Sequence, residues 1–227
     1  ERTGGGDVYV LTLSTGDVRR VTWDDGPELL DGWSRDSRWL YFSSTGRDIA
    51  AMNDVFRVSV DGGTPQAVSA DRYVNEFGAA PAPDGRHVAI VARGISSAQW
   101  WRRGSSHIDQ SELWLLDLDA PAVSAYAPLP AGDARNAWPM WSRDGRALYF
   151  VSDADGVENL WSMPVTDARA GAPRPLTSFR GGRVLFPTIT ADGRTIAFER
   201  DFGIWTLDTA SGAVRSVPIT RRGAVSA

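Results

Sequence analysis

Lysine and cysteine are both missing from this chain of 227 residues, and each absence removes a class of chemistry. All 24 basic residues are arginine, so no lysine can act as a nucleophile, a base or a Schiff-base former. Without cysteine the chain has neither disulfides nor thiol chemistry, which leaves its redox compartment open.

Histidine and long apolar runs are also scarce, and positive charge is not in excess. The two histidines lie in no recognisable nucleophile motif and no G-x-S-x-G elbow occurs, so no Ser-His-Asp set can be named. Nucleic acids and anionic membranes attract basic surfaces, whereas the net charge here is −4. No apolar run reaches the length of a membrane span. We therefore predict no catalytic residue, no cofactor, no nucleic-acid partner and no membrane insertion.

The chain is built instead from one repeated phrase, which is clearest at residues 141–165, WSRDGRALYFVSDADGVENLWSMPV. A polar turn is followed by an apolar stretch, a second turn and a stretch with an aromatic residue. Asp can bond its own backbone two residues on and Gly accepts a positive φ, so Asp-Gly between apolar runs predicts a hairpin. The turn recurs as WSRDSR (33–38), PAPDGR (81–86), WSRDGR (141–146) and ITADGR (189–194).

An aromatic stretch follows the turns at a regular distance. It occurs five times, as DVYVLTL from Asp7, DVFRVSV from Asp54, ELWLLDL from Glu112, NLWSMPV from Asn159 and GIWTLD from Gly203. These runs alternate or are continuously apolar, without the three-and-four spacing of a helix, so the chain is predicted to be all-β. Four-stranded units repeated radially make a β-propeller, in which the aromatic residue fills space between blades. A parallel β-helix would need much shorter repeats.

The repeats divide the chain into four complete four-stranded antiparallel blades and half of another, 18 strands in all. Residues 1–22 hold only the last two strands of a blade, and the complete units cover 27–69, 75–129, 136–177 and 183–219. No linker separates them, so we expect a single propeller domain over residues 1–227. We also expect an open arc with an unpaired strand near Asp7 to Leu13, unless other sequence or a second molecule completes it.

Propeller geometry assigns a functional face from sequence. The loop before each inner strand and the loop between the second and third strands share one face, and the Asp-Gly turns lie on the other. Ligand-binding candidates at the inner-strand starts are Glu76, Arg135 and Arg183, with Glu28, Asn75 and Asn136 nearby. The loop 93–111 lies on this face too, and it widens the spacing of the turn aspartates Asp36, Asp84, Asp144 and Asp192 from 48 to 60 residues before returning to 48.

The long loop carries the remaining ligand-binding candidates. Paired tryptophans and paired arginines are residue types enriched at binding hot spots, and arginine can bind a carboxylate through two hydrogen bonds. In the alternative interpretation, the tryptophans plug the channel or pack on a neighbouring domain while the arginines bond backbone carbonyls. The candidates in this loop are Trp100, Trp101, Arg102, Arg103, His107 and Asp109.

Metal-binding patterns are incomplete, so we predict no metal site. His107 and Asp109 are only two ligands from one loop. Asp153, Asp155 and Glu158 imitate a calcium loop, but they occupy an ordinary turn between the second and third strands and lack the full ligand series.

The Ser-x-Asp-Gly blade resembles the TolB-like propellers, and longer stretches resemble the N-terminal propeller of tricorn-type serine peptidases. The resemblance covers nearly the whole chain, and its longer segments are more specific than the turn motif. They include NDVFRVSVDGGTPQ (53–66), QWWRRGSSHIDQSELWL (99–115), WPMWSRDGRALYFVSD (138–153) and FERDFGIWTLDT (198–209). The resemblance implies a six-bladed propeller, of which roughly one and a half blades would precede Glu1, with PDZ and peptidase domains downstream.

Two functions are consistent with these sequence features. The first is a non-catalytic propeller that binds or gates peptide segments within a larger tricorn-like serine peptidase, with peptides and the downstream domains of the parent chain as partners. The alternative is a TolB-like cell-envelope scaffold that binds a protein partner without proteolysis. A bacterial periplasmic or exported location is favoured over the cytoplasm.

Overall fold

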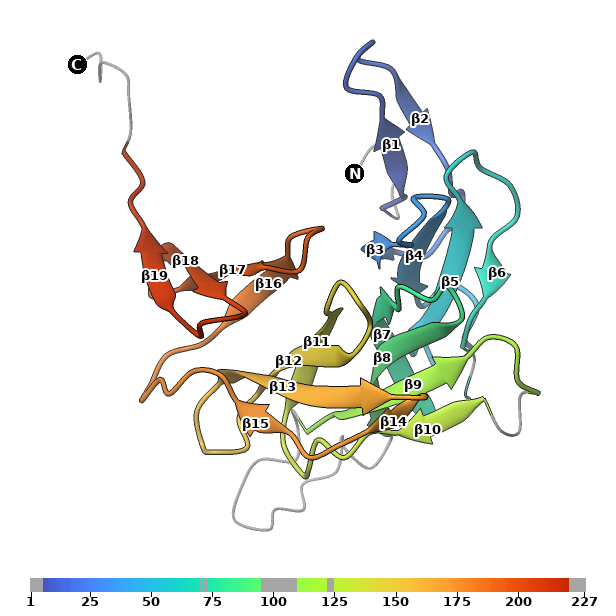
Figure 1. The fold of residues 1–227 in the computed structure, drawn as a ribbon. Helices are drawn as coiled ribbons and strands as arrows, with labels where there is room; N and C mark the ends of the chain where they lie inside the picture. The colour runs from blue at the N-terminus through green and yellow to red at the C-terminus, as the bar shows by residue number, and fades with distance from the viewer. Residues whose placement is uncertain (1–5, 70, 72, 95–109, 122–124, 221–227) are drawn as a thin grey trace.

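The described residues of the computed structural model, 6–69, 71, 73–94, 110–121 and 125–220, form strands and turns without a helix. Their strands make four antiparallel sheets and one hairpin, which follow one another along an arc (Figure 1). This confirms the prediction of an all-β propeller built from four-stranded blades. Within these residues no helix has the length and apolar character that a membrane span requires.

The hairpin forms a half blade and the sheets form blades I to IV. The half blade contains β1 (Tyr9–Leu11) and β2 (Val18–Arg20). Blade I contains β3 (Glu28–Trp33), β4 (Trp39–Ser44), β5 (Asp54–Ser59) and β6 (Gln66–Ala67). Blade II contains β7 (Val74–Pro81), β8 (His87–Gly94), β9 (Glu112–Asp117) and β10 (Tyr126–Pro128).

The remaining blades follow the same order. Blade III contains β11 (Asn136–Trp141), β12 (Ala147–Ser152), β13 (Asn159–Thr166), β14 (Arg169–Ala170) and β15 (Arg174–Pro175). Blade IV contains β16 (Leu185–Ile189), β17 (Thr195–Arg200), β18 (Gly203–Asp208) and β19 (Val214–Val217). The structure has one strand more than predicted, β14. It forms a short hairpin with the end of β13, and β15 then pairs with an earlier part of β13.

The Asp-Gly turns join the first and second strands of the blades, as predicted. Asp144 Oδ1 accepts hydrogen bonds from the Ser142 hydroxyl at 2.7 Å and the Arg146 N–H at 3.1 Å. Gly145 has a φ of 70°, a conformation that glycine adopts without strain. In the turn that lacks glycine, Ser37 takes the same left-handed conformation. The local chemistry of each turn therefore fixes the hairpin.

The first two strands of each blade are irregular where the inner strand bends. Their register shifts between Leu30 and Gly32, between Phe77 and Ala80, between Ala137 and Met140, and between Leu185 and Thr188. Such a shift marks a β-bulge, which increases the local bend and twist of the strand. The bulge recurs in all four blades and is thus part of the repeat.

Apolar side chains between neighbouring blades form the core. Phe56 packs with Val8 and Val21 of the half blade, and Trp161 packs with Leu113 and Leu115 of blade II. The aromatic position of the third strand thus faces the preceding blade in both cases, which confirms its predicted role as filler between blades.

The two ends of the blades are occupied by different connections. The Asp-Gly turns lie at one end, which we call the turn face. At the other end, the loop face, the loop before an inner strand meets the loop between the second and third strands. The Arg135 N–H donates to Asp153 Oδ1 at 2.8 Å, and the Asn53 N–H donates to Asn75 Oδ1 at 2.7 Å. The predicted assignment of faces is therefore correct for these blades.

The arc is open in the part of the chain that the structure describes. The half blade and blade IV stand at its two ends, and no sheet joins them (Figure 1). In that part, β1 pairs with β2 alone, as expected for the segment near Asp7 to Leu13.

Candidate functional site

At the loop face, a recurring hydrogen bond joins the outer and third strands within the half blade, blade I and blade III. A Ser or Thr that follows the outer strand accepts a hydrogen bond from the third strand of the same blade. Thr22 Oγ1 accepts the Val8 N–H at 2.9 Å, Ser69 Oγ accepts the Val55 N–H at 3.1 Å, and Thr177 Oγ1 accepts the Leu160 N–H at 3.0 Å. We number the junctions between consecutive blades from the half blade onwards, first to fourth.

The fourth junction brings together two of the predicted arginines on one carboxylate. Glu158 Oε1 accepts hydrogen bonds from Arg135 Nη1 at 2.7 Å and from Arg183 Nε at 3.1 Å. Its other oxygen accepts the Val184 N–H at 2.9 Å. The Glu158 side chain is buried, and charge-assisted hydrogen bonds of this kind are stronger than neutral ones. We call these three side chains, Arg135, Glu158 and Arg183, the arginine clamp.

The two arginines of the clamp differ in exposure. The Arg135 side chain is 18% exposed and lies 5.1 Å from the centre of the Trp138 ring, so it is held by a carboxylate and an aromatic face. The Arg183 side chain is 60% exposed. Because a guanidinium has five N–H donors and Arg183 uses one on Glu158, it can offer others to a ligand.

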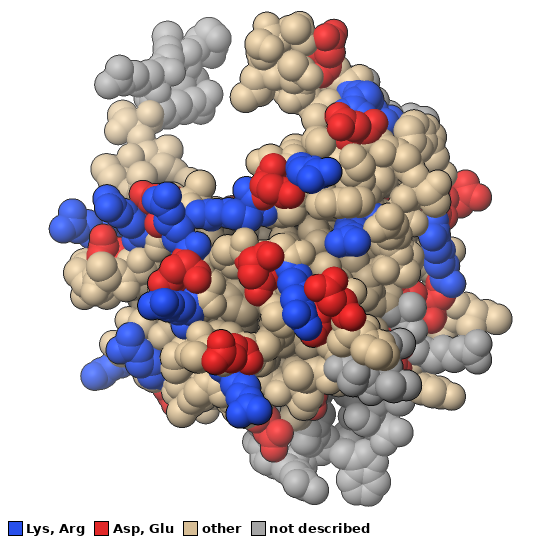
Figure 2. Space-filling view, turned by 45° about the vertical axis from the view of Figure 1, so that its right-hand side comes forward, with Lys and Arg blue, Asp and Glu red and all other residues tan. Residues whose placement is uncertain are grey.

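A cavity of about 600 Å³ opens beside the clamp. Its wall also includes Gly182, whose φ of 75° is a backbone conformation that glycine adopts without strain. The lining residues are Gln110, Asp133, Ala134, Arg135, Asp153, Ala154, Gly156, Val157, Glu158, Gly181, Gly182 and Arg183. The cavity therefore contains both signs of charge, and over the wider surface acidic and basic side chains are interspersed (Figure 2).

Glu76, the third described candidate, lies at the second junction and is fully buried. Its Oε2 accepts the Asp71 N–H at 3.1 Å. Burial raises the pKa of Glu76 to about 7, and the nearby carboxylates Asp54 and Asp71 add to the rise. Asp54 is buried too, and burial raises its pKa to about 6. This junction is acidic, in contrast to the clamp.

The other sequence candidates lie outside the described residues. These are Trp100, Trp101, Arg102, Arg103, His107 and Asp109, so the prediction for the long loop stays a prediction. In the described part of the chain, no group of three or more His, Cys, Asp or Glu side chains is arranged to hold a metal ion.

Sequence reasoning missed the role of Glu158. In the sequence this residue only completes an imitation of a calcium loop, whereas the structure uses the carboxylate to join two blades. Its partners lie 23 and 25 residues away. The only sequence signal for this role was that Glu158 lies in the loop between the second and third strands. The propeller topology places that loop beside the start of an inner strand.

Comparison with known proteins gives a family and several relatives. The family described as the tricorn protease N-terminal beta propeller domain matches residues 1–213. A tricorn protease homolog of Saccharolobus solfataricus is 24% identical over 216 residues, which is 95% of this chain and 18% of that protein. An uncharacterized protein of Agrobacterium fabrum is 26% identical over 145 residues, 64% of this chain and 46% of that one.

Solved structures show the same fold. TolB from Acinetobacter baumannii superposes with a TM-score of 0.70 at 18% identity, covering 92% of this chain and 47% of that chain. The chain thus spans less than half the length of these two relatives and of this TolB structure.

Proposed function

Because this chain belongs to the tricorn protease N-terminal beta propeller family, we propose that it is a non-catalytic module that binds or gates peptide segments within a longer peptidase. Peptides and the further domains of the parent chain are its partners in this proposal. The chain itself contributes no Cys or Lys and no G-x-S-x-G motif to catalysis.

The cavity beside the arginine clamp carries the proposal. It opens on the loop face, where two arginines chosen from sequence position converge with Glu158. Clefts lined by a few convergent polar groups are the usual form of a ligand site. In this arrangement Arg135 holds Glu158 in place, and the exposed Arg183 contacts the ligand.

A peptide carboxylate is the ligand group that fits Arg183 best, because a guanidinium matches a carboxylate with two parallel hydrogen bonds. Glu158 already takes one donor, and the side chain is exposed, so the gain is small. We therefore expect affinities in the micromolar to millimolar range, roughly −8 to −4 kcal/mol. Arg102 and Arg103 belong to the same proposal but lie outside the described residues.

The test compares peptides that end in a free carboxylate with the same peptides as amides, by calorimetric titration of the chain. We expect the acids to bind more tightly and Arg183→Ala to reduce the difference. Arg194→Ala is the control, because this exposed arginine adjoins an Asp-Gly turn on the opposite face.

Equal binding of acids and amides, or equal effects of the two variants, would remove the clamp from the proposal. If no peptide binds at all, the alternative of a TolB-like scaffold that binds a protein partner replaces it. The likeness to TolB supports that alternative only at the level of the fold.

A further inference from the structure

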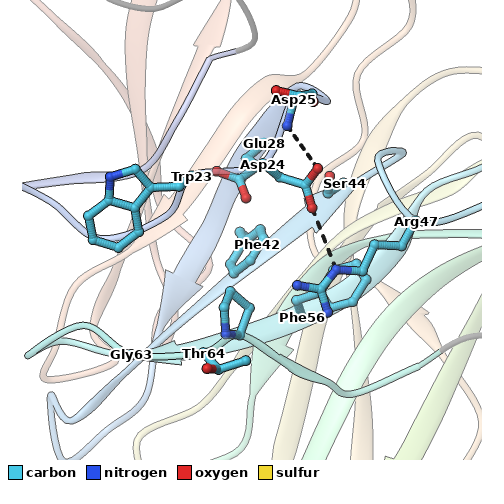
Figure 3. A pocket seen from close by; sticks show the side chains of 11 residues that line it. Trp23, Asp24, Asp25, Glu28, Phe42, Ser44, Arg47, Phe56, Gly63 and Thr64 are labelled. Atoms are coloured by element: carbon cyan, nitrogen blue, oxygen red, sulfur yellow. Dashed lines mark hydrogen bonds and ion pairs between the residues drawn. The ribbon is translucent and has the colours of Figure 1, made fainter.

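A second cavity lies at the first junction, and it is lined differently from the cavity at the clamp. Its volume is about 380 Å³. The lining residues are Trp23, Asp24, Asp25, Glu28, Phe42, Ser44, Arg47, Phe56, Gly63, Thr64 and Pro65 (Figure 3). They come from the loop before β3, from β3, β4 and β5, and from the loops on either side of β5. We call this cavity the aromatic pocket.

Aromatic rings form part of the wall of this pocket. Phe42 and Phe56 stack with their ring centres 5.7 Å apart, and both are buried. Trp23 is 61% exposed and lies to one side of them in Figure 3. Aromatic faces carry negative charge, so they attract cations that approach over the ring.

Carboxylates outnumber arginine in the pocket by three to one. Asp24, Asp25 and Glu28 line it together with Arg47 alone among the basic residues. Glu28 is buried and accepts a hydrogen bond from the Thr22 hydroxyl. Burial raises the pKa of Glu28, and Asp7 and Asp24 raise it further. A positive ligand would offset the electrostatic cost of these carboxylates.

Arg47 already occupies the position in which such a ligand would bind. Its guanidinium carbon lies 5.1 Å from the centre of the Phe56 ring, and its Nε lies 3.5 Å from Asp24 Oδ2 (Figure 3). The side chain is nevertheless 46% exposed. An exposed ion pair at this distance is weak, so another cation can replace it.

The backbone of the two loops fixes this arrangement. At Gly26 an added Cβ would come within 2.7 Å of Gly46 Cα, which is a backbone atom. Only glycine permits such close approach. The segment that carries Asp24 is therefore packed closely against the loop that carries Arg47, which brings the two side chains to the same pocket.

We infer that the aromatic pocket binds the guanidinium or ammonium group of a basic peptide side chain, and that Arg47 is an internal substitute which this group displaces. The inference rests on the proposed function as a peptide-binding module, and it adds a preference for basic residues. It places a cation site at the first junction and the carboxylate site at the fourth.

The test uses N-acetyl-arginine amide, which carries a single positive charge, and N-acetyl-citrulline amide, its neutral isostere. Binding to the chain is followed by calorimetry or by ligand NMR. We expect the arginine probe to bind and the citrulline probe to bind at least about fivefold more weakly, because only the charged probe can form an ion pair with the carboxylates and a cation–π contact with the rings.

Three variants separate a site from a merely structural contact. Asp24→Asn should weaken binding of the arginine probe about fivefold or more. Arg47→Ala should strengthen it about threefold to tenfold, since the competitor is removed from the pocket. Arg57→Ala should leave it unchanged, because Arg57 stacks 4.6 Å from the Trp39 ring centre in the same blade and does not line the pocket.

Equal binding of the two probes, or weaker binding after Arg47→Ala in a variant that folds normally by circular dichroism, would overturn the inference. Its failure is separable from failure of the proposed function. If the arginine probe does not bind but peptide acids still bind through Arg183, the inference fails and the proposed function stands. If neither binds, both fail.

Discussion

The first and fourth junctions each bury a glutamate at the loop face, yet they surround it in opposite ways. Glu158 accepts hydrogen bonds from two arginines, whereas Glu28 accepts one from the Thr22 hydroxyl and lies near Asp7 and Asp24. Since the blades on both sides are alike, the fold does not dictate the sign of the charge. It requires only that the polar backbone between blades be satisfied.

The second junction sharpens this comparison. Asp54 occupies the place in blade I that Asp7 occupies in the half blade. Asp7 precedes Val8, whose N–H donates to Thr22, and Asp54 precedes Val55, whose N–H donates to Ser69. Asp7 is paired with Arg20 at 2.6 Å. The residue in register with Tyr9 is Arg20, whereas the residue in register with Phe56 is Ala67. Asp54 thus lacks the arginine that its counterpart has.

The consequence is visible in the hydrogen bonds of the second junction. Within the described residues, Asp54 Oδ1 and Glu76 Oε1 are buried and accept no hydrogen bond. Burial penalises the charged form of both carboxylates, and neighbouring carboxylates add to the penalty, which is why both pKa values rise. Removing the Glu158 carboxylate should therefore lower the stability of the fold, whereas removing the Glu76 charge should raise it.

The largest expected effect is at the clamp. Glu158→Ala leaves Arg135 buried without its carboxylate and removes the acceptor of the Val184 N–H. We expect it to lower the free energy of unfolding by about 3 kcal/mol, the usual cost of breaking a buried pair. Urea denaturation measures this.

The neighbouring Asp155 provides the control for that measurement, because it is exposed in the same loop. Asp155→Ala should change the free energy of unfolding by less than about 0.5 kcal/mol. Similar losses for the two variants would show that the clamp does not hold blades III and IV together.

The second expected effect is a pH dependence that arises at the second junction. The pKa of Glu76 is about 7 in the folded protein, above its ordinary 4.5, so the folded state binds the proton more tightly. Stability contributed by this group is therefore present below about pH 4.5 and is lost as the pH rises towards 7. Asp54 acts in the same direction between its ordinary 3.8 and about 6.

Glu76→Gln should remove most of this dependence. We expect the variant to be more stable than the parent chain at pH 8 by roughly 1–3 kcal/mol, and the difference to shrink or reverse at pH 4.5. Unfolding free energies measured between pH 4.5 and 8 provide the test. A parent chain whose stability rises over this range, or a variant with the same profile, would contradict the expected electrostatic cost.

Sequence predicted the repeat well because its information is local. Asp144 and Gly145 determine a turn by themselves, and four copies of that turn fix the blades, the faces and the positions of Arg135 and Arg183. The extra hairpin at β14 was missed, since it lies in a connection that the other blades do not share.

The character of each junction was not predictable in the same way. Glu158 accepts hydrogen bonds from Arg135 and Arg183 across two blades. Asp24 lies near Arg47 because the backbones of Gly26 and Gly46 come close together. Such pairings depend on how far one loop reaches towards another, which periodicity does not encode. They are also where the repeats differ from one another, and hence where the candidate sites lie.

The smallest expected effect comes from transferring the missing arginine to the second junction. Ala67→Arg places a guanidinium in the register position that Arg20 holds in the half blade, where it can reach Asp54 as Arg20 reaches Asp7. Ala67 is exposed, so the substitution needs no room in the core. We expect a gain of up to about 1 kcal/mol at pH 8, with less gain at pH 5, where more of Asp54 is protonated.

Ala172→Arg is the matched control, because Ala172 is also exposed and lies away from the second junction, between β14 and β15 of blade III. A gain confined to Ala67→Arg, and a weaker fall in stability with rising pH, would show that the acidic second junction differs from the first by one absent arginine. If both variants gave the same small change, the effect would come from overall charge, since the net charge of −4 becomes less negative in each. Asp54 and Asp7 would then share a backbone position, but an arginine in register would not stabilise Asp54 as Arg20 stabilises Asp7.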